Sequence, residues 1–183
     1  SSSSSLVVAV MVSASSSSRR SFGKPQRAYA QRVFRVVVVV VVVRWVRRCQ
    51  SIMKGVDVVY HCAATAHEGL SVFSPYEITK NNYLASVSIF SAAVNEKVKR
   101  IIFCSSMARY GGQQTPFTEE MKPTPVDPYA ISKVASEEVL KNLCDLNNIE
   151  WVIAVPHNII GPRQKYDDPF RNVVSIMINR MMQ

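Results

Sequence analysis

The alternation of apolar runs and helical patterns after residue 50 is the feature that most limits how this chain can fold. Short apolar runs occur at residues 56–63, 100–105 and 151–156. Between them lie residues 75–93 and 128–146, where apolar side chains recur at helical spacing. Strands that alternate with helices in this way predict an α/β fold, in which a parallel sheet is joined by right-handed crossovers. A further helix is expected from about residue 171.

Polar side chains stand where each apolar run ends. Ser105 and Ser106 close the second run, Tyr129 and Lys133 lie early in the helix that follows it, and Asn158 follows the third run. Ligands of open parallel sheets bind beyond the carboxyl ends of the strands. We therefore expect these side chains to share one site.

Tyr129 and Lys133 are four residues apart, so they lie on one face of the predicted helix. A free tyrosine has a pKa of about 10 and is a poor base at neutral pH, but a nearby ammonium lowers that pKa. Pro128 opens the helix and places Tyr129 in its first turn, near the positive helix end. The pattern predicts a tyrosine that accepts a proton, although the motif alone also fits a packed tyrosine beside a solvated lysine.

These elements together resemble one enzyme family. The apolar strand ending in Ser-Ser, the Tyr-Gly pair four residues later and the Pro-Tyr-x-x-x-Lys helix resemble the extended short-chain dehydrogenase/reductases. Within that group they are similar to the nucleotide-sugar epimerases of the UDP-glucose and UDP-N-acetylglucosamine 4-epimerase type. The resemblance covers about residues 51–183. It implies a Rossmann-like, doubly wound parallel sheet, NAD as cofactor and a nucleotide-sugar substrate.

The resemblance also implies roles for individual residues. Tyr129 would be the catalytic base, assisted by Lys133 and Ser106, while the sugar C4 is oxidised to a keto intermediate and reduced again. The residues implied to bind the cofactor are Cys62, Ala63, Ala64, Asn82, Ser105, Tyr129, Lys133, Pro156 and His157. Those implied to bind the substrate are Ser106 and Asn158.

Two positions favour an epimerase over its relatives. Sugar-nucleotide dehydratases and decarboxylases of this type carry an acidic residue just after the catalytic serine or threonine. Met107 and Ala108 stand there, and neither can transfer a proton. Two alternatives stay open: another short-chain reductase or dehydrogenase, and an inactive fragment whose basic arm binds an anionic surface.

Residues 1–50 differ in amino-acid composition from the rest of the chain. They contain serine runs, an unbroken run of valines at 36–43 and no acidic residue. A transit peptide, a signal-type core at 6–12, and an atypical version of the first βαβ unit are possible interpretations; we favour the third. The valine run fits a buried parallel strand and is too short to span a membrane. We therefore divide the chain into an atypical Ser/Val/Arg-rich segment at 1–50 and a catalytic part at 51–183.

Two departures from the family pattern accompany this division. Gly23 stands alone where the family has a glycine-rich turn for the cofactor pyrophosphate. The chain ends at Gln183, within a predicted helix, where family members continue into a substrate-capping region. These features predict that the cofactor loop is lost and that the substrate region is truncated.

The net charge and the cysteines limit the classes of partner and the cellular compartment that we expect. The net charge is +9, but the excess positive charge falls in the acid-free residues 1–50, so the remaining chain does not predict a nucleic-acid surface. The four cysteines form no Cys-x-x-Cys pair, which predicts buried free thiols in a reducing compartment, hence a cytoplasmic protein.

His61 and His67 have no third ligand nearby, so no metal is expected and His61 is predicted to pack at a strand end. No membrane partner is expected, and a homodimer is possible by analogy.

Overall fold

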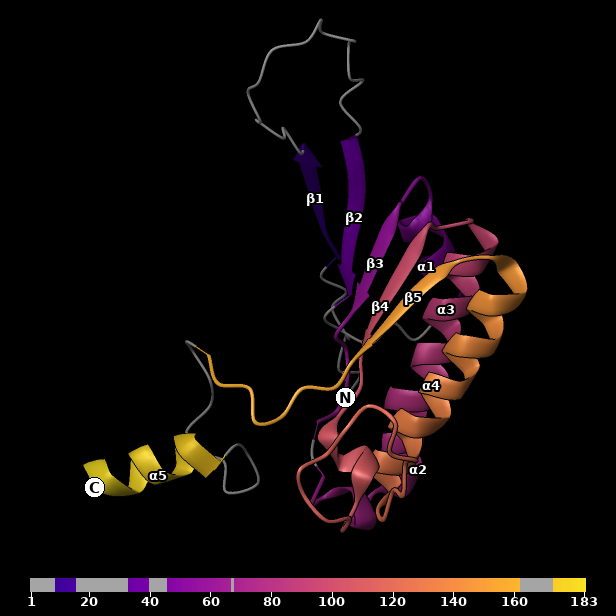
Figure 1. Cartoon of the computed structure of the whole chain (residues 1–183). Helices are drawn as coiled ribbons and strands as arrows, with labels where there is room; N and C mark the ends of the chain where they lie inside the picture. Colours follow the sequence, from indigo (N-terminus) through magenta and orange to yellow (C-terminus); the bar gives the residue numbers. More distant parts are fainter. Residues whose placement is uncertain (1–8, 16–32, 40–45, 67, 162–172) are drawn as a thin grey trace, which may run out of the picture.

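The computed structural model describes residues 9–15, 33–39, 46–66, 68–161 and 173–183. Within these residues the strands form a single sheet in chain order, β1-β2-β3-β4-β5. Their bounds are β1 Ala9–Ser15, β2 Val33–Val39, β3 Val58–His61, β4 Arg100–Cys104 and β5 Glu150–Ala154. The strands from β2 to β5 run parallel, whereas β1 is antiparallel to β2 (Figure 1).

The three strands predicted after residue 50 are confirmed as β3, β4 and β5, and the parallel α/β sheet is confirmed with them. The valine run contributes residues 36–39 to β2, which pairs in parallel with β3 from Val36 and Val58 onward. Residues 40–43 lie outside the described part of the chain. Because β1 and β2 are antiparallel, they are not the two parallel strands of a βαβ unit.

The helices also follow the predicted pattern. Helical turns run without a break from residue 75 to residue 95, close to the predicted 75–93. This segment comprises α2 Pro75–Ile78, the π-helical turn η2 Thr79–Leu84 and α3 Ala85–Asn95. The other helices are α1 Val46–Met53, α4 Pro128–Asn147 and α5 Val173–Met182. Two 3-10 turns, η1 Ser71–Phe73 and η3 Met107–Tyr110, lie in the connections.

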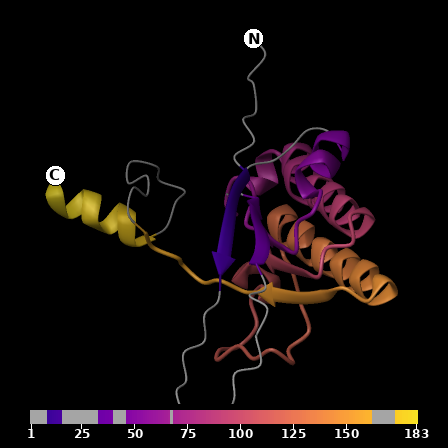
Figure 2. The same ribbon diagram turned by 90° about the horizontal axis from the view of Figure 1, so that it is seen from above.

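In the described part of the chain, α1, α3 and α4 cover one face of the sheet (Figures 1 and 2). Side chains alternate along each strand, so Val59, Ile101 and Phe103 are fully buried beneath these helices. On the opposite face, Tyr60 is 40% exposed and Val152 is 46% exposed. The second helical layer of a doubly wound sheet is not among the described residues.

The start of α4 is fixed by local chemistry. Asp127 is the N-cap residue, and its Oδ1 accepts a hydrogen bond of 2.9 Å from the backbone N–H of Ala130. The Ser71 hydroxyl donates to the same oxygen at 3.2 Å, which ties η1 to this cap. Pro128 occupies the first turn, where its missing N–H costs little. The cap and the proline therefore fix where α4 begins.

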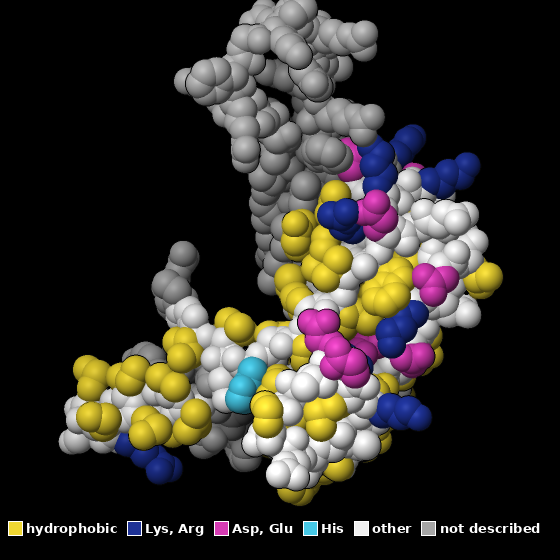
Figure 3. All heavy atoms as spheres, viewed as in Figure 1, with side chains coloured by type: hydrophobic (Ala, Val, Ile, Leu, Met, Phe, Trp, Pro, Cys, Tyr) yellow, Lys and Arg dark blue, Asp and Glu magenta, His cyan; other side chains and the backbone are white. Residues whose placement is uncertain are grey.

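Helix α5 extends away from the sheet (Figure 1). Apolar side chains lie on its surface (Figure 3). Its most exposed large apolar side chains are those of Val173, Met177, Ile178, Met181 and Met182. None of the helices formed by the described residues is long and apolar enough to cross a membrane.

Candidate active site

The carboxyl ends of β4 and β5 are joined by backbone hydrogen bonds. The N–H of Ser105 donates to the Ala154 carbonyl at 2.8 Å, and the N–H of Met107 donates to the Pro156 carbonyl at 3.3 Å. The segment after β4 therefore runs beside the segment after β5. Since β3 is the parallel neighbour of β4, all three strand ends open onto one edge of the sheet (Figure 1).

Tyr129 and Ser106 meet at this edge, as the sequence predicts. Tyr129 lies in the first turn of α4 and is 7% exposed. The Ser106 hydroxyl lies close enough to the Tyr129 phenol to act to lower its pKa, because hydrogen bonding from the serine favours the phenolate. Ser106 also caps η3, because its Oγ accepts from the N–H of Ala108 at 3.2 Å. The cap holds the serine in place beside the tyrosine.

Lys133 lies one turn further along α4 and is 3% exposed. Its Nζ donates a hydrogen bond of 2.8 Å to the Cys104 carbonyl and lies 5.9 Å from the centre of the Tyr129 ring. Burial lowers the pKa of this amine to about 8, while Cys104, Cys62 and Glu137 act to raise it. A pKa of about 8 leaves most of the amine protonated at neutral pH. The structure thus places a buried cation next to the tyrosine.

The pKa of Tyr129 itself is raised. Burial is the largest cause, and the carboxylates of Glu68 and Asp127 raise it further, while the hydrogen bond from Ser106 acts to lower it. The Lys133 amine is directed to the Cys104 carbonyl, and the lowering of the Tyr129 pKa by Lys133 together with an oxidised cofactor stays a prediction. The sequence pattern does not predict an effect of Glu68, since nothing in its spacing connects it to Tyr129.

Asn82 holds the loop that follows β3. It is buried on the π-helical turn η2, a feature often found at functional sites. The Thr65 N–H donates to its Oδ1 at 2.7 Å, and its Nδ2 donates to the Thr65 carbonyl at 3.3 Å. This clamp fixes the end of the loop that contains Ala63 and Ala64. In this structure Asn82 contributes to the site by positioning the loop after β3.

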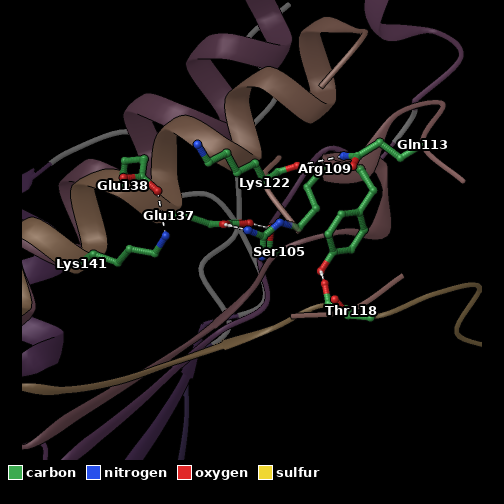
Figure 4. A network of polar contacts seen from close by, with 9 residues as sticks. Ser105, Arg109, Gln113, Thr118, Lys122, Glu137, Glu138 and Lys141 are labelled. Carbon is green, nitrogen blue, oxygen red and sulfur yellow. Dashed lines mark hydrogen bonds and ion pairs between the residues drawn. The ribbon is translucent and has the colours of Figure 1, made fainter. Parts of the chain in front are cut away.

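Ser105 turns its hydroxyl into the protein interior. The hydroxyl donates to Glu137 on α4, and a guanidinium nitrogen of Arg109 lies 3.3 Å from the other carboxylate oxygen (Figure 4). Glu137 is fully buried and Arg109 nearly so. Any cofactor contact of Ser105 must therefore come from its backbone. No sequence motif predicts this ion pair, although Glu137 lies four residues after Lys133 on the same helix face.

The loop after η3 folds back on itself. The Thr124 N–H donates to the Arg109 carbonyl at 2.8 Å. The Tyr110 hydroxyl donates to the carbonyl of Thr118, which is labelled in Figure 4, at 3.1 Å. Gly111 has a φ of +56°, and a Cβ at this position would lie 2.2 Å from the Thr124 carbonyl oxygen. The predicted loop at 107–127 is thus a tightly bonded segment that supports the Ser106 side of the site.

The segment after β5 reaches the site only in part. Pro156 is bound to Met107 through its carbonyl, next to Ser106. His157 and Asn158 are exposed and lie 3.0 Å apart through Nε2 and Nδ2. Within the described residues, no hydrogen bond connects either side chain to Tyr129 or Ser106. Residues 162–172, which continue this segment, lie outside the described chain.

The predictions for the histidines and cysteines are confirmed at some positions and corrected at others. His61 ends β3 and packs between Phe90 and Phe103, which confirms it as a packing residue. His67 lies outside the described residues, among which no group of three or more potential metal ligands occurs. Cys49 and Cys144 are buried free thiols as predicted. The prediction is wrong for Cys62, which is exposed because it lies just beyond the end of β3, and for Cys104, which is only half-buried.

The groups at this edge suit the ribose and nicotinamide end of a dinucleotide. The Tyr129 phenol and the Lys133 ammonium lie one turn apart on α4 at this edge, and such groups can bind hydroxyl groups. The segment predicted to lack the glycine turn for the pyrophosphate contains Gly23, which lies outside the described residues.

Sequence comparison gives a consistent match. The NAD dependent epimerase/dehydratase family matches residues 7–183. The human dTDP-D-glucose 4,6-dehydratase is 30% identical over 123 residues, which make up 67% of this chain and 35% of that protein. A putative UDP-glucose 4-epimerase of Methanocaldococcus jannaschii is 32% identical over 134 residues, 71% of this chain and 43% of that protein. The chain thus spans less than half the length of these relatives.

Solved structures of similar fold include two epimerases. The UDP-N-acetylglucosamine 4-epimerase of Methanobrevibacter ruminantium, in complex with UDP-N-acetylmuramic acid, has a TM-score of 0.70 at 33% identity and covers 73% of this chain and 44% of its own. The UDP-glucose 4-epimerase of Thermotoga maritima, with UDP-glucose, has a TM-score of 0.69 at 28% identity and covers 75% and 46%. These similarities confirm the Rossmann-like fold.

Proposed function

The chain belongs to the NAD-dependent epimerase/dehydratase family, and from that premise we propose that it carries the catalytic centre of a nucleotide-sugar 4-epimerase. The observation that carries the proposal is the buried Tyr129 phenol in the first turn of α4, with the buried Lys133 amine 5.9 Å from the centre of its ring and Ser106 acting to lower its pKa. Such a triad can move a proton to and from a sugar hydroxyl while an adjacent cofactor changes its redox state.

Tyr129, Ser106 and Lys133 would have the following roles in the epimerisation. Tyr129 takes the proton of the sugar C4 hydroxyl, and Ser106 holds the oxygen by a hydrogen bond as a carbonyl forms at C4. The same pair returns the proton after the sugar ring has turned over, which leaves the hydroxyl on the other face. Lys133 supplies a positive charge beside the phenol and donors for the ribose hydroxyls. NAD, when bound, supplies the redox step and, in its oxidised form, a second positive charge.

The positive charge of the oxidised cofactor would act against the groups that raise the pKa of Tyr129. Burial and the carboxylates of Glu68 and Asp127 keep the phenol protonated in the protein alone. A cation that binds at this edge favours the phenolate and acts in the opposite direction. Tyr129 would therefore become a base only when the cofactor is present, so that an empty site stays inactive.

The residues after Ser106 support epimerisation over dehydration. Dehydration needs an acid that protonates the leaving hydroxyl group. Met107 and Ala108 follow the serine directly and carry no titratable group. The human relative named above is a dehydratase, so the two activities are the competing outcomes of any assay.

The substrate we propose is a nucleoside-diphosphate sugar. The epimerases solved with UDP-glucose and with UDP-N-acetylmuramic acid are similar to this chain. We assign substrate contacts to Ser106 and Asn158, and a cofactor contact to His157. A cytoplasmic location and a homodimer remain predictions.

The test is a product analysis with matched variants. The purified chain is incubated with NAD and UDP-glucose, and the products are followed by nuclear magnetic resonance. We expect UDP-galactose, with activity abolished in Tyr129→Phe and retained in Tyr76→Phe, because Tyr76 is an exposed tyrosine on α2. A keto product that has lost water, or full activity in Tyr129→Phe, would refute the proposal.

A further inference from the structure

Cys62 and Cys104 form a pair of thiols at the edge of the sheet. Strands β3 and β4 are parallel neighbours, and their register ends with His61 opposite Phe103. The next positions along the two strands are Cys62 and Cys104, whose Sγ atoms lie 3.4 Å apart. Both are free thiols, and one donates a hydrogen bond to the other.

This arrangement is within reach of a disulfide bond. Neighbouring strands lie about 4.8 Å apart, inside the range of about 4.4–6.8 Å between the Cα atoms of disulfide-bonded cysteines. The sulfur atoms would have to approach from 3.4 Å to about 2.05 Å, which rotation of the side chains can provide. The backbone of the two strand ends can therefore stay in place.

Accessibility sets this pair apart from the other cysteines. Cys62 is exposed and Cys104 is half-buried, whereas Cys49 and Cys144 are buried in the core. We propose that Cys62 and Cys104 are a dithiol modification site, which small-molecule disulfides such as glutathione disulfide oxidise to an intramolecular disulfide. The inference does not depend on the proposed function.

The exchange proceeds in two balanced steps. The Cys62 thiolate attacks one sulfur of glutathione disulfide, the bond between its sulfurs breaks, and one glutathione leaves as a thiolate. The Cys104 thiolate then attacks the Cys62 sulfur, and the second glutathione leaves. Two protein thiols are oxidised, one disulfide is reduced to two thiols, and the two protons pass from the cysteines to the released glutathiones.

The surroundings of the pair affect how fast this occurs. Burial and the Cys104 thiol raise the pKa of Cys62 to about 11, while the nearby Lys133 ammonium acts to lower it. Only the thiolate reacts. The rate of exchange should therefore rise about tenfold with each pH unit below that pKa, because the thiolate fraction does.

The site also touches the catalytic region. The Cys104 carbonyl accepts the hydrogen bond from Lys133, and Cys62 lies at the beginning of the loop that Asn82 clamps. A bond between the two sulfurs would join these two backbone segments beside the lysine.

The test uses the whole chain under native conditions. The protein is incubated with glutathione disulfide at several pH values, quenched with acid, alkylated after denaturation and mapped by mass spectrometry. We expect a peptide linking Cys62 to Cys104, a mass lower by two hydrogens, and unlinked Cys49 and Cys144. The rate of linkage should rise about tenfold from pH 7 to pH 8.

Single variants separate a true pair from a lone reactive thiol. In Cys104→Ser, the mixed disulfide between Cys62 and glutathione should accumulate, since no second thiol can displace it. In Cys62→Ser, the linkage should vanish. Circular dichroism checks that both variants are folded. The proposal fails if the parent protein accumulates the mixed disulfide at Cys62 without linkage, or if linkage involves Cys49 or Cys144.

Discussion

The imidazole of His61 donates a hydrogen bond of 2.8 Å from Nε2 to the hydroxyl oxygen of Ser86. The direction follows from the serine, because its single hydroxyl hydrogen is already donated to the Asn82 carbonyl at 2.6 Å. His61 is therefore the neutral tautomer with its proton on Nε2. Its Nδ1 has no hydrogen-bond partner within the described residues.

This histidine predicts a pH dependence of stability. Burial, with a smaller contribution from Lys133, lowers its pKa from 6.5 to about 3. Between these values the unfolded chain binds a proton that the folded chain does not. The free energy of unfolding should therefore fall as the pH drops from 6.5 towards 3, by up to about 1.4 kcal/mol per pH unit. Urea unfolding between pH 7 and pH 4 measures this slope.

The matched variant is His61→Gln, whose amide keeps an N–H donor and does not titrate. It should flatten the pH dependence of the free energy of unfolding in this range. Equal slopes in the parent and the variant would mean that His61 is not the group responsible.

Glu68 should control the proton affinity of Tyr129. Its carboxylate raises the pKa of the phenol, so Glu68→Gln should lower it, and phenolate should form at a lower pH. Ultraviolet difference titration, with each protein compared to its own Tyr129→Phe derivative, isolates this phenol from the other tyrosines. Glu119→Gln, at an exposed loop position, should leave the titration unchanged. An upward shift in Glu68→Gln would contradict the assignment.

The ion pair of Arg109 and Glu137 should be costly to break on one side only. Glu137→Gln keeps an acceptor for the Ser105 hydroxyl but leaves the nearly buried guanidinium without its counter-charge. We expect a loss of about 3–5 kcal/mol in the free energy of unfolding. The double variant Glu137→Gln with Arg109→Met removes both charges and should recover part of the loss. If the single and double variants are equally stable, the pair is not coupled.

Gly111 and Gly112 provide a side-by-side comparison of backbone strain. Gly111→Ala forces a side chain into a φ of +56° and against the Thr124 carbonyl, so it should cost about 1–3 kcal/mol or more. Gly112→Ala meets no atom within 4 Å and should be nearly neutral. Chemical denaturation of the two variants gives the difference. Equal stabilities would show that the loop rearranges around the new side chain.

Sequence periodicity predicted the strands and helices after residue 50 because each has one apolar face that must be buried. The start of α4 followed from Pro128, and the meeting of Ser106 with Tyr129 followed from the rule that parallel strand ends share one edge. These inferences depend on local pattern and topology, which the sequence displays directly.

Other features depend on side-chain directions that no spacing displays. Ser105 and Ser106 are adjacent, yet one hydroxyl enters the core towards Glu137 and the other faces Tyr129. The exposure of Cys62 depends on β3 ending at His61. The antiparallel pairing of β1 with β2 has no sequence signal, because a run of valines suits either direction.

The Asn82 clamp has a chemical consequence for that position. A carboxamide presents one acceptor and one donor, as a peptide unit does, and Thr65 pairs with both. The side chain of Asn82 therefore pairs with the loop after β3 as the backbone of a neighbouring strand pairs with a strand at the edge of a sheet. Aspartate would set a carboxylate against the Thr65 carbonyl, leucine would leave both backbone groups unpaired, and glutamine is one methylene too long. Among the side chains, only asparagine has both the right length and the one acceptor and one donor that are needed to bind the N–H and the carbonyl of the same residue from this helix position.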